Sequence, residues 1–281
     1  MKMKEANMPN AKDMAASATK RILFVGETGS GKSAQMWTLP GRKFLYLFDP
    51  NTKATIGKHK NRSGLDIEYE EFLPDLGELD ASLKKFNKEG KSDHLKGPKR
   101  EPTLYNNWVE DLNEKGSSGF FNQFDWLCID SLTFLCKACM DRQLFINGRY
   151  GDIEELADYR VVGSKISHVF DSVCSTDTNI YMTGHIDKFQ DEKTKKIETL
   201  IRSPGSSRSM LPLIFTDIWQ AERAEDAKGN PIYTARTMPD VRGLKSIRCS
   251  IPDVPEIVDV TIPDFPSNKG GIGALLAKYN S

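Results

Sequence analysis

Residues 26–33 read Gly-Glu-Thr-Gly-Ser-Gly-Lys-Ser and directly follow the apolar run at 22–25, Ile-Leu-Phe-Val. The spacing is G-x-x-x-x-G-K-[ST], which forms a phosphate-binding loop (P-loop) when a strand precedes it and a helix follows. Glycines let the backbone approach a ligand closely, and the loop N–H groups then point at phosphates beside the positive end of the helix. The sequence therefore predicts a nucleoside triphosphate site.

The residue types in this loop suggest individual roles. The side chain of Lys32 can reach the β- and γ-phosphates, and the hydroxyl of Ser33 can ligate Mg²⁺. We therefore expect ATP with Mg²⁺ as the bound species. The residues predicted to contact the nucleotide are Gly26, Glu27, Thr28, Gly29, Ser30, Gly31, Lys32, Ser33 and Ala34.

Composition narrows the remaining possibilities. The 281 residues suffice for one large or two small domains, and a hydrophobic content of 38% is lean enough to suggest some tail or loop. The formal net charge is +0, which excludes a global basic field, so any nucleic-acid binding has to be local. No apolar run reaches membrane-spanning length, and we expect no membrane association.

The five cysteines favour a reducing compartment. Cys136 and Cys139 form C-x-x-C inside an apolar helical stretch, but no second pair or nearby histidine completes a zinc site. We expect buried, reduced thiols and a cytoplasmic protein.

Strand and helix patterns alternate along the chain, which predicts an α/β fold with a mostly parallel sheet. Strands are expected at 21–25, 44–48, 66–72, 125–130, 179–184, 214–220 and 232–237. Helices are expected at 32–39, 73–86, 103–115, 132–146, 153–172 and 270–280. Residues 186–206 are predicted to form a polar hairpin or a mobile loop.

We predict three segments. Residues 1–20 are expected to be a flexible tail and residues 21–250 the phosphate-binding domain. Residues 251–281 are expected to be an extended, proline-rich segment that closes with a short helix.

Asp130 has the pattern of a second phosphate-site motif, Walker B. It ends the apolar strand 126–129, and a carboxylate at the tip of a strand beside the P-loop can hold Mg²⁺ through water. The next residue is Ser131, whereas in AAA+ ATPases a glutamate general base usually follows the aspartate. The serine favours the RecA-like branch, in which the glutamate comes from elsewhere in the sheet.

Four stretches carry a resemblance to RecA-type ATPases, and more closely to the compact RecA-like ATPases of phage recombination and replication modules. They are Gly26–Ser33, Lys43–Pro50, Ile129–Thr133 and Met182–Ile186. Together they span most of residues 21–222. The resemblance implies a three-layer α/β/α P-loop NTPase that hydrolyses ATP, acts on single-stranded DNA as a homo-oligomer, and works in a bacterial host cytoplasm.

The resemblance also assigns roles around the phosphates. A polar residue at the end of the fourth core strand, here His185, senses the γ-phosphate, with Thr183 as a possible helper. The family usually places Asp-x-Glu after the second strand, but this chain has Asp49-Pro-Asn51, and an asparagine cannot accept a proton from water. Candidates for the general base are Asp49, ranked first, then Glu70 and Glu71. Slow hydrolysis, or binding without turnover, stays open.

Positively charged side chains are candidates for two further roles: assisting ATP hydrolysis from a neighbouring subunit, and contacting nucleic acid. An arginine acting in trans could be Arg202, Arg208 or Arg223. The segment Ser203–Ser209 is expected to be flexible and resembles the family loop that meets DNA or a neighbour. The stretches Lys84–Arg100 and Lys188–Arg208, the second containing Lys193, Lys195 and Lys196, could contact phosphate backbones, although neither has interleaved aromatic residues.

Three functions fit these patterns. The first is a RecA-like ATPase acting on single-stranded DNA, in which ATP orders residues 186–208 through His185. The second is a nucleotide-dependent switch or assembly factor for a protein partner. The third, a small-molecule kinase, is disfavoured because no cluster of lid arginines is evident and Thr-Gly-His after the fourth strand is unexpected.

Overall fold

The computed structural model describes residues 19–59, 67–74, 101–174, 176–190, 195, 197–240, 244–265 and 269–279. The predicted tail up to residue 18, the predicted helix beyond residue 74 and the basic stretch Lys84–Arg100 lie outside the described residues.

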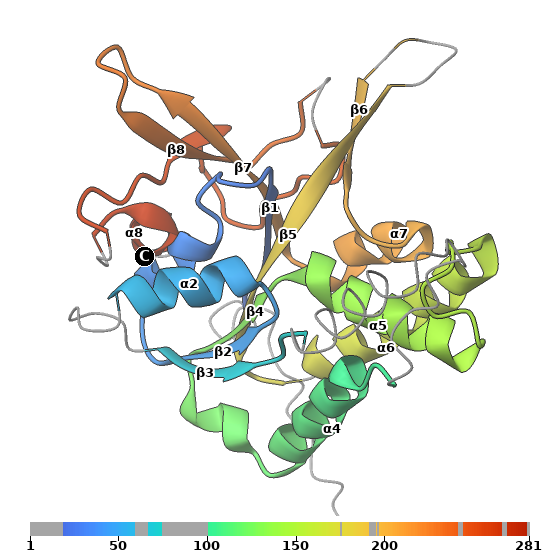
Figure 1. Cartoon of the computed structure of the whole chain (residues 1–281). Coiled ribbons are helices and arrows are strands. Elements are labelled where there is room, and N and C mark those ends of the chain that lie inside the picture. The colour runs from blue at the N-terminus through green and yellow to red at the C-terminus, as the bar shows by residue number, and fades with distance from the viewer. Residues whose placement is uncertain are drawn as a thin grey trace, which may run out of the picture.

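Strands and helices alternate as the sequence predicts (Figure 1). The strands are β1 (Arg21–Gly26), β2 (Lys43–Leu47), β3 (Ile67–Glu71), β4 (Trp126–Asp130), β5 (Asn179–Gln190), β6 (Ile197–Ile201), β7 (Asp217–Glu225), β8 (Pro231–Arg236) and β9 (Ile257–Asp259). The helices are α2 (Pro50–His59), α4 (Leu104–Ser117), α5 (Leu132–Ile146), α6 (Leu156–Cys174), α7 (Gly205–Ile214) and α8 (Gly271–Tyr279), with 3-10 helices η1 (Ser33–Thr38) and η2 (Phe120–Gln123).

The central sheet is mixed but mainly parallel. Within the described residues its strands run in the order β3-β2-β4-β5-β1-β7-β8-β9, and β6 pairs with the outer part of β5. The pairs from β3 through β7 are parallel, whereas β5–β6, β7–β8 and β8–β9 are antiparallel. The fold is therefore an α/β P-loop NTPase fold, as predicted.

One predicted neighbour relation is wrong. The strand ending in Asp130, β4, does not lie beside the P-loop strand β1, because β5 pairs with both and separates them. His185 on β5 is paired with Gly26 of the P-loop in the sheet register. The strand predicted to carry the sensor therefore lies between the two phosphate-site motifs.

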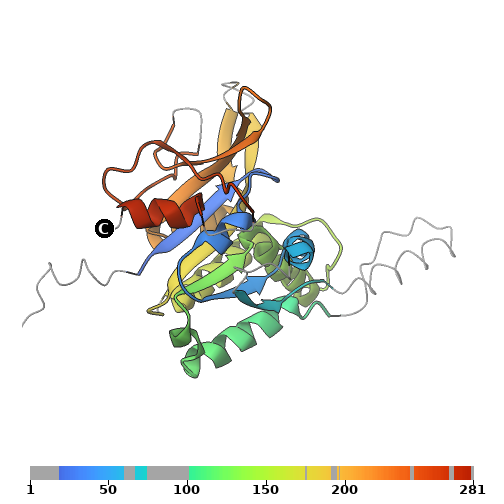
Figure 2. The same ribbon diagram turned by 90° about the vertical axis from the view of Figure 1, so that its left-hand side faces the viewer.

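Alternating side chains of the strands build two apolar cores on opposite faces of the sheet. One core packs Leu23, Tyr46 and Ile129 against α4, α5, α6 and α7. The other packs Phe24 and Leu45 against η1 and α8. Figure 2 shows α4 and α8 on opposite sides of the sheet. Because both faces are covered, the strands read as continuous apolar runs.

The helix after the P-loop differs from the expected one. Residues 33–38 form a 3-10 helix rather than an α-helix, and Pro40 holds the preceding Leu39 in an extended conformation that ends it. Residues from the C-terminal part pack directly on this short helix. The Gln35 side chain donates to the Val260 carbonyl at 2.9 Å and accepts from the Ile272 N–H at 2.8 Å.

The region after the fourth core strand is a hairpin followed by a helix. The predicted hairpin is confirmed by the antiparallel pairing of β5 with β6, which projects from the same edge of the sheet as the β7–β8 hairpin (Figure 1). The prediction that Ser203–Ser209 is flexible is wrong, since α7 begins at Gly205. Buried Leu211 and Ile214 anchor α7 to the core, and the Ser207 hydroxyl donates to the Pro204 carbonyl at 2.7 Å.

Candidate functional site

The P-loop connects β1 to η1 and is shaped by close backbone contacts. A Cβ at Gly26 would lie 2.5 Å from the Ala221 carbonyl oxygen, and one at Gly31 would lie 2.8 Å from the Tyr233 ring. Gly31 also has a positive φ of 82°. A side chain at either position would push the loop away from its neighbouring strands, which explains the glycine at each.

Lys32 is folded back into the loop. Its Nζ donates to the carbonyl oxygens of Gly26 at 3.0 Å and Glu27 at 2.7 Å. Burial lowers the pKa of Lys32 to about 8, although the charges of Asp130, Asp49 and Glu27 act in the opposite direction. The ammonium group is thus held inside the loop by backbone carbonyl oxygens.

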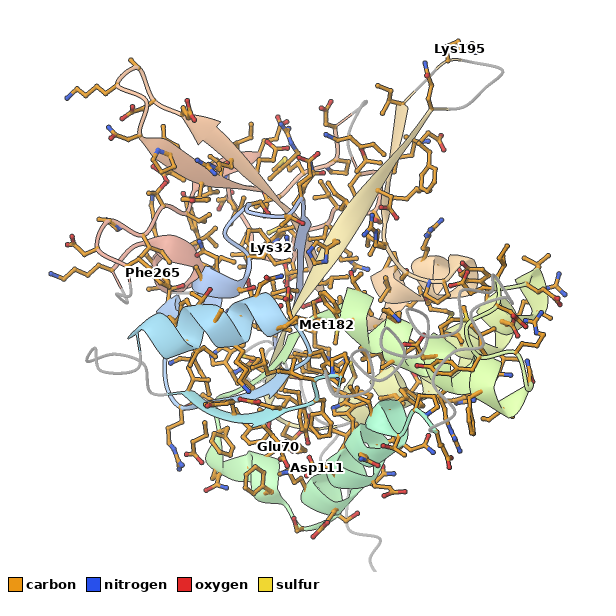
Figure 3. The ribbon with its side chains drawn as sticks, in the orientation of Figure 1. Lys32, Glu70, Asp111, Met182, Lys195 and Phe265 are labelled. Carbon is orange, nitrogen blue, oxygen red and sulfur yellow. The ribbon has the colours of Figure 1, made fainter. Side chains whose placement is uncertain are left out.

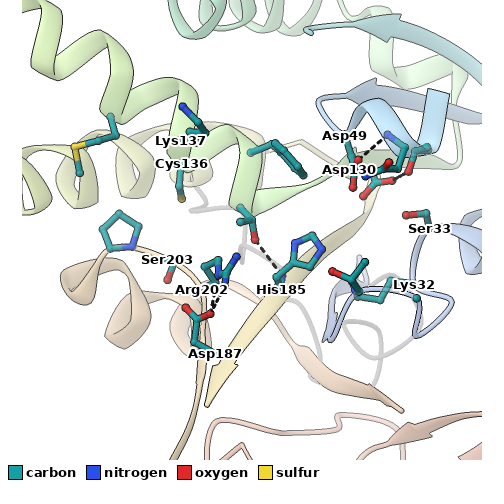
Figure 4. A pocket seen from close by; sticks show the side chains of 18 of the residues that line it. Lys32, Ser33, Asp49, Asp130, Cys136, Lys137, His185, Asp187, Arg202 and Ser203 are labelled. Atoms are coloured by element: carbon teal, nitrogen blue, oxygen red, sulfur yellow. Dashed lines mark hydrogen bonds and ion pairs between the residues drawn. The ribbon is translucent and has the colours of Figure 1, made fainter. Parts of the chain in front are cut away.

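Asp130 lies at the end of β4 and is almost completely buried. Its Oδ2 accepts a hydrogen bond from the Thr52 hydroxyl at 2.6 Å, and its Oδ1 accepts one from the Thr183 hydroxyl. Burial raises the pKa of Asp130, whereas hydrogen bonds from Thr183, Thr52 and Ser33 lower it. The serine and the carboxylate that the sequence predicts as metal ligands therefore face each other (Figure 4).

His185 lies at the point where β5 leaves the sheet. Its backbone N–H donates to the Thr133 hydroxyl at 3.0 Å, and its carbonyl accepts from the Arg202 N–H at 2.8 Å. Burial, followed by the charge of Lys32, lowers the pKa of His185 to about 4. Its Nδ1 is buried and has no hydrogen-bond partner among the described residues. The surroundings of His185 therefore favour the neutral imidazole at pH 7.

These side chains line one cavity of about 1010 Å³. Lys32, Ser33, Asp49, Asp130 and His185 all contribute to its wall. The cavity continues past the phosphate end toward α5, α6 and α7. Residues on that side that the sequence did not point to are Phe134, Lys137, Asp141, Glu154 and Tyr159.

The three candidates for the general base differ in whether they line this cavity. Asp49 lines the cavity, and its Oδ1 accepts from the Asn51 N–H at 2.8 Å at the start of α2. Glu70 and Glu71 are not part of the lining; they form ion pairs with Lys115 and Lys53. Figure 3 places Glu70 near Asp111, away from Lys32. Among the three, only Asp49 lines the cavity that also contains Lys32 and Ser33.

The candidate arginines are also separated. Arg202 and Arg208 line the cavity, whereas Arg223 on β7 does not. Arg202 forms an ion pair with Asp187, and the Arg208 Nε donates to the Ile201 carbonyl at 3.0 Å. Both guanidinium groups are therefore tied within their own chain.

A comparison with protein families matches residues 18–237 to the family described as AAA domain. The chain belongs to this AAA domain family. Among solved structures it is similar to the flagellar accessory protein FlaH from Methanocaldococcus jannaschii, with 12% sequence identity, a TM-score of 0.40, and coverage of 90% of this chain and 87% of that chain. No curated protein matches the chain.

The residues of this AAA domain fit Mg²⁺ bound together with a nucleotide. A serine hydroxyl and a carboxylate are the hard oxygen ligands that Mg²⁺ takes, and phosphate oxygens and water complete its shell. Among the described residues no group of three or more His, Cys, Asp or Glu side chains could hold a metal alone. Ser33 and Asp130 would thus hold the ion only in concert with phosphates.

No helix in the described part of the AAA domain is long and apolar enough to cross a membrane.

Thr52 is the contact that sequence reasoning missed. It lies outside both phosphate motifs, and nothing in its local sequence distinguishes it from Thr55 one turn later. Only the folded arrangement brings its hydroxyl to Asp130, 78 residues further along the chain.

Proposed function

We propose that this AAA domain protein binds and hydrolyses ATP with Mg²⁺ and couples that cycle to binding of single-stranded DNA. The observation that carries the proposal is the continuity of β5. One strand runs from its pairing with the P-loop strand, through His185, into the hairpin whose far end carries Lys195 (Figure 3). A change at the phosphates and a change at the hairpin would therefore share one strand.

Cations are gathered around this hairpin. A groove of about 890 Å³ between β6, α7 and residues 244–246 is lined by Lys188, Lys195, Arg208 and Lys245, with Glu198 as the acidic residue of the lining. In a chain of zero net charge, this local excess of cations suits a phosphate backbone. Arg208 lines both this groove and the nucleotide cavity, which supports coupling between the two.

An ion pair also joins the P-loop to the hairpin. Glu27 in the loop accepts from Lys188 on β5 at 2.5 Å, and both side chains are more than half exposed. Its own contribution to stability is small because it is exposed. A bound triphosphate would bring negative charge beside Glu27 and compete for Lys188. Weakening of this ion pair would then free the hairpin from the P-loop.

Each site residue has a role in the proposed hydrolysis. Lys32 would neutralise charge on the β- and γ-phosphates, and Asp49 would accept a hydrogen bond from the attacking water. The neutral ring of His185 would donate from a nitrogen to a γ-phosphate oxygen. When bound at Ser33 and Asp130, Mg²⁺ would offset phosphate charge. Asn51 in place of the family's glutamate leads us to expect slow turnover.

We also propose that the protein works as a homo-oligomer in the cytoplasm. Because Arg202 and Arg208 are tied within their own chain, we propose that a neighbouring subunit or the DNA strand releases one of them. All five cysteines are free in the described structure, which fits a reducing compartment.

ATP hydrolysis with and without single-stranded DNA, measured beside Lys32→Ala, tests the proposal. We expect turnover that DNA stimulates and that the variant loses. DNA affinity at several salt concentrations should fall in Lys195→Glu but not in Lys278→Glu, a change on α8 away from the hairpin. Turnover without any DNA binding would contradict the DNA part of the proposal.

A second candidate is a nucleotide-dependent switch for a protein partner. Ile153 and Leu156, between α5 and the start of α6, are 85% and 70% exposed, which is unusual for large apolar side chains near a ligand cavity. Glu154, between them, lines the nucleotide cavity. ATP binding with neither turnover nor DNA binding would favour this function.

A further inference from the structure

The carboxylate of Asp130 is held by two hydroxyl groups from different parts of the chain. Thr183 comes from β5 and donates to Oδ1, while Thr52 comes from the first turn of α2 and donates to Oδ2 at 2.6 Å. An ionised carboxylate offers about four acceptor positions. The two threonines take one on each oxygen and leave the others for Ser33 and the metal.

Thr52 is itself fixed by its surroundings. The residue is only 3% exposed, and its N–H donates to the Asp49 carbonyl at 3.1 Å. The N–H groups of Phe48 and Asp49 both donate to the Asp130 carbonyl, at 2.6 and 3.0 Å. The start of α2 is therefore attached to Asp130 through both backbone and side chain, so the Thr52 hydroxyl cannot move without moving this junction.

We propose that Thr52 is a positioning residue for the metal ligand Asp130. Its hydroxyl fixes the rotation of the carboxylate so that the free oxygen positions face Ser33. The inference rests on the proposed binding of ATP with Mg²⁺, and it adds a residue to that site outside both phosphate motifs. Groups that orient a metal ligand typically change metal affinity or activity by about 10- to 100-fold when removed.

The helix provides its own control. Thr55 lies one turn later on α2 and lines the same cavity, but its hydroxyl donates to the Asn51 carbonyl at 3.0 Å. Thr55→Val therefore removes a hydroxyl from the same wall without touching Asp130. Thr52→Val removes the hydroxyl that holds the carboxylate and keeps the side-chain shape. Thr52→Ser restores the hydroxyl.

The experiment measures binding rather than turnover. A fluorescent ATP analogue is titrated in EDTA and at increasing Mg²⁺, and Mn²⁺ binding to the ATP complex is followed by electron paramagnetic resonance. We expect Thr52→Val to raise the half-saturating metal concentration by about 10- to 100-fold. Its affinity for nucleotide in EDTA should match that of the wild type. Thr55→Val and Thr52→Ser should keep the wild-type metal requirement.

Two results would overturn the inference. One is a Thr52→Val protein with the same metal requirement as Thr55→Val. The other is a Thr52→Val protein that loses nucleotide affinity in EDTA as much as in Mg²⁺, because that would indicate general damage to the cavity. A wild-type protein that binds no nucleotide at all would instead refute the proposed function, and the inference with it.

Discussion

Acid should destabilise this protein in part through His185. The imidazole is half-buried, and burial lowers its pKa to about 4, with Lys32 and Arg202 acting in the same direction. Asp130 and Asp187 oppose the shift but do not cancel it. The folded protein therefore disfavours the charged ring, whereas the unfolded chain protonates it near its ordinary pKa of 6.5.

The sign and size of the effect follow from proton linkage. Because the folded-state pKa is the lower one, the stability from the neutral ring is fully present above about pH 6.5 and is lost as the pH falls toward 4. Between those values the unfolded chain binds the additional proton. Because the ring is only half-buried, solvent screens part of the shift, and near pH 4.5 the loss amounts to about 1–2 kcal/mol of the free energy of unfolding.

Chemical denaturation of the wild type and His185→Gln near pH 7 and near pH 4.5 measures this loss. We expect the wild type to lose about 1–2 kcal/mol more than the variant on acidification, since glutamine does not titrate. His168→Gln, which removes an exposed imidazole on α6, is the control and should behave as the wild type. Equal acid losses in the wild type and His185→Gln would refute the reasoning.

Three further predictions test the packing and the chemistry. Gly273→Ala should destabilise the fold by about 3 kcal/mol in denaturant titrations, because a Cβ there would lie 1.7 Å from the Thr38 carbonyl oxygen. Gly57→Ala, with nothing within 4 Å of the new Cβ, should instead stabilise helix α2 by about 0.5–1 kcal/mol. Asp49→Asn should reduce ATP turnover by at least about 100-fold in a phosphate-release assay, whereas Glu70→Gln should leave it near wild type; the reverse order would exclude Asp49 as the base.

The parts of the fold that the sequence predicts are those set by local pattern. The strands at β1, β2, β4 and the inner part of β5 are apolar runs because helices cover both faces of the sheet. The P-loop can be predicted for the same reason, since its glycines and its lysine all lie within residues 26–32. The predicted boundaries of these elements agree with the structure to within a few residues.

Strand order and the long-range contacts could not be predicted in the same way. Nothing local in β5 indicates that it lies between β1 and β4, because that placement depends on how the whole sheet assembles. Gln35 meets Ile272 across 237 residues, and Thr52 meets Asp130 across 78. The local sequence does not predict the start of α7, because Pro-Gly-Ser-Ser is typical of loops and the buried side chains that stabilise the helix come later in it.

The packing around the P-loop indicates which neighbouring elements could move if a nucleotide bound there. On one side, Gln35 and Thr38 of η1 are held by the backbone of α8, and a contact as close as that at Gly273 leaves no room for movement. Asp130, on β4, is fixed by buried hydroxyls of α2 and β5. Beyond Ile186, in contrast, β5 pairs only with β6 among the described strands, and Phe189 is 48% exposed. A rearrangement driven by phosphate binding would meet least resistance along the hairpin, which is also where the cations are gathered.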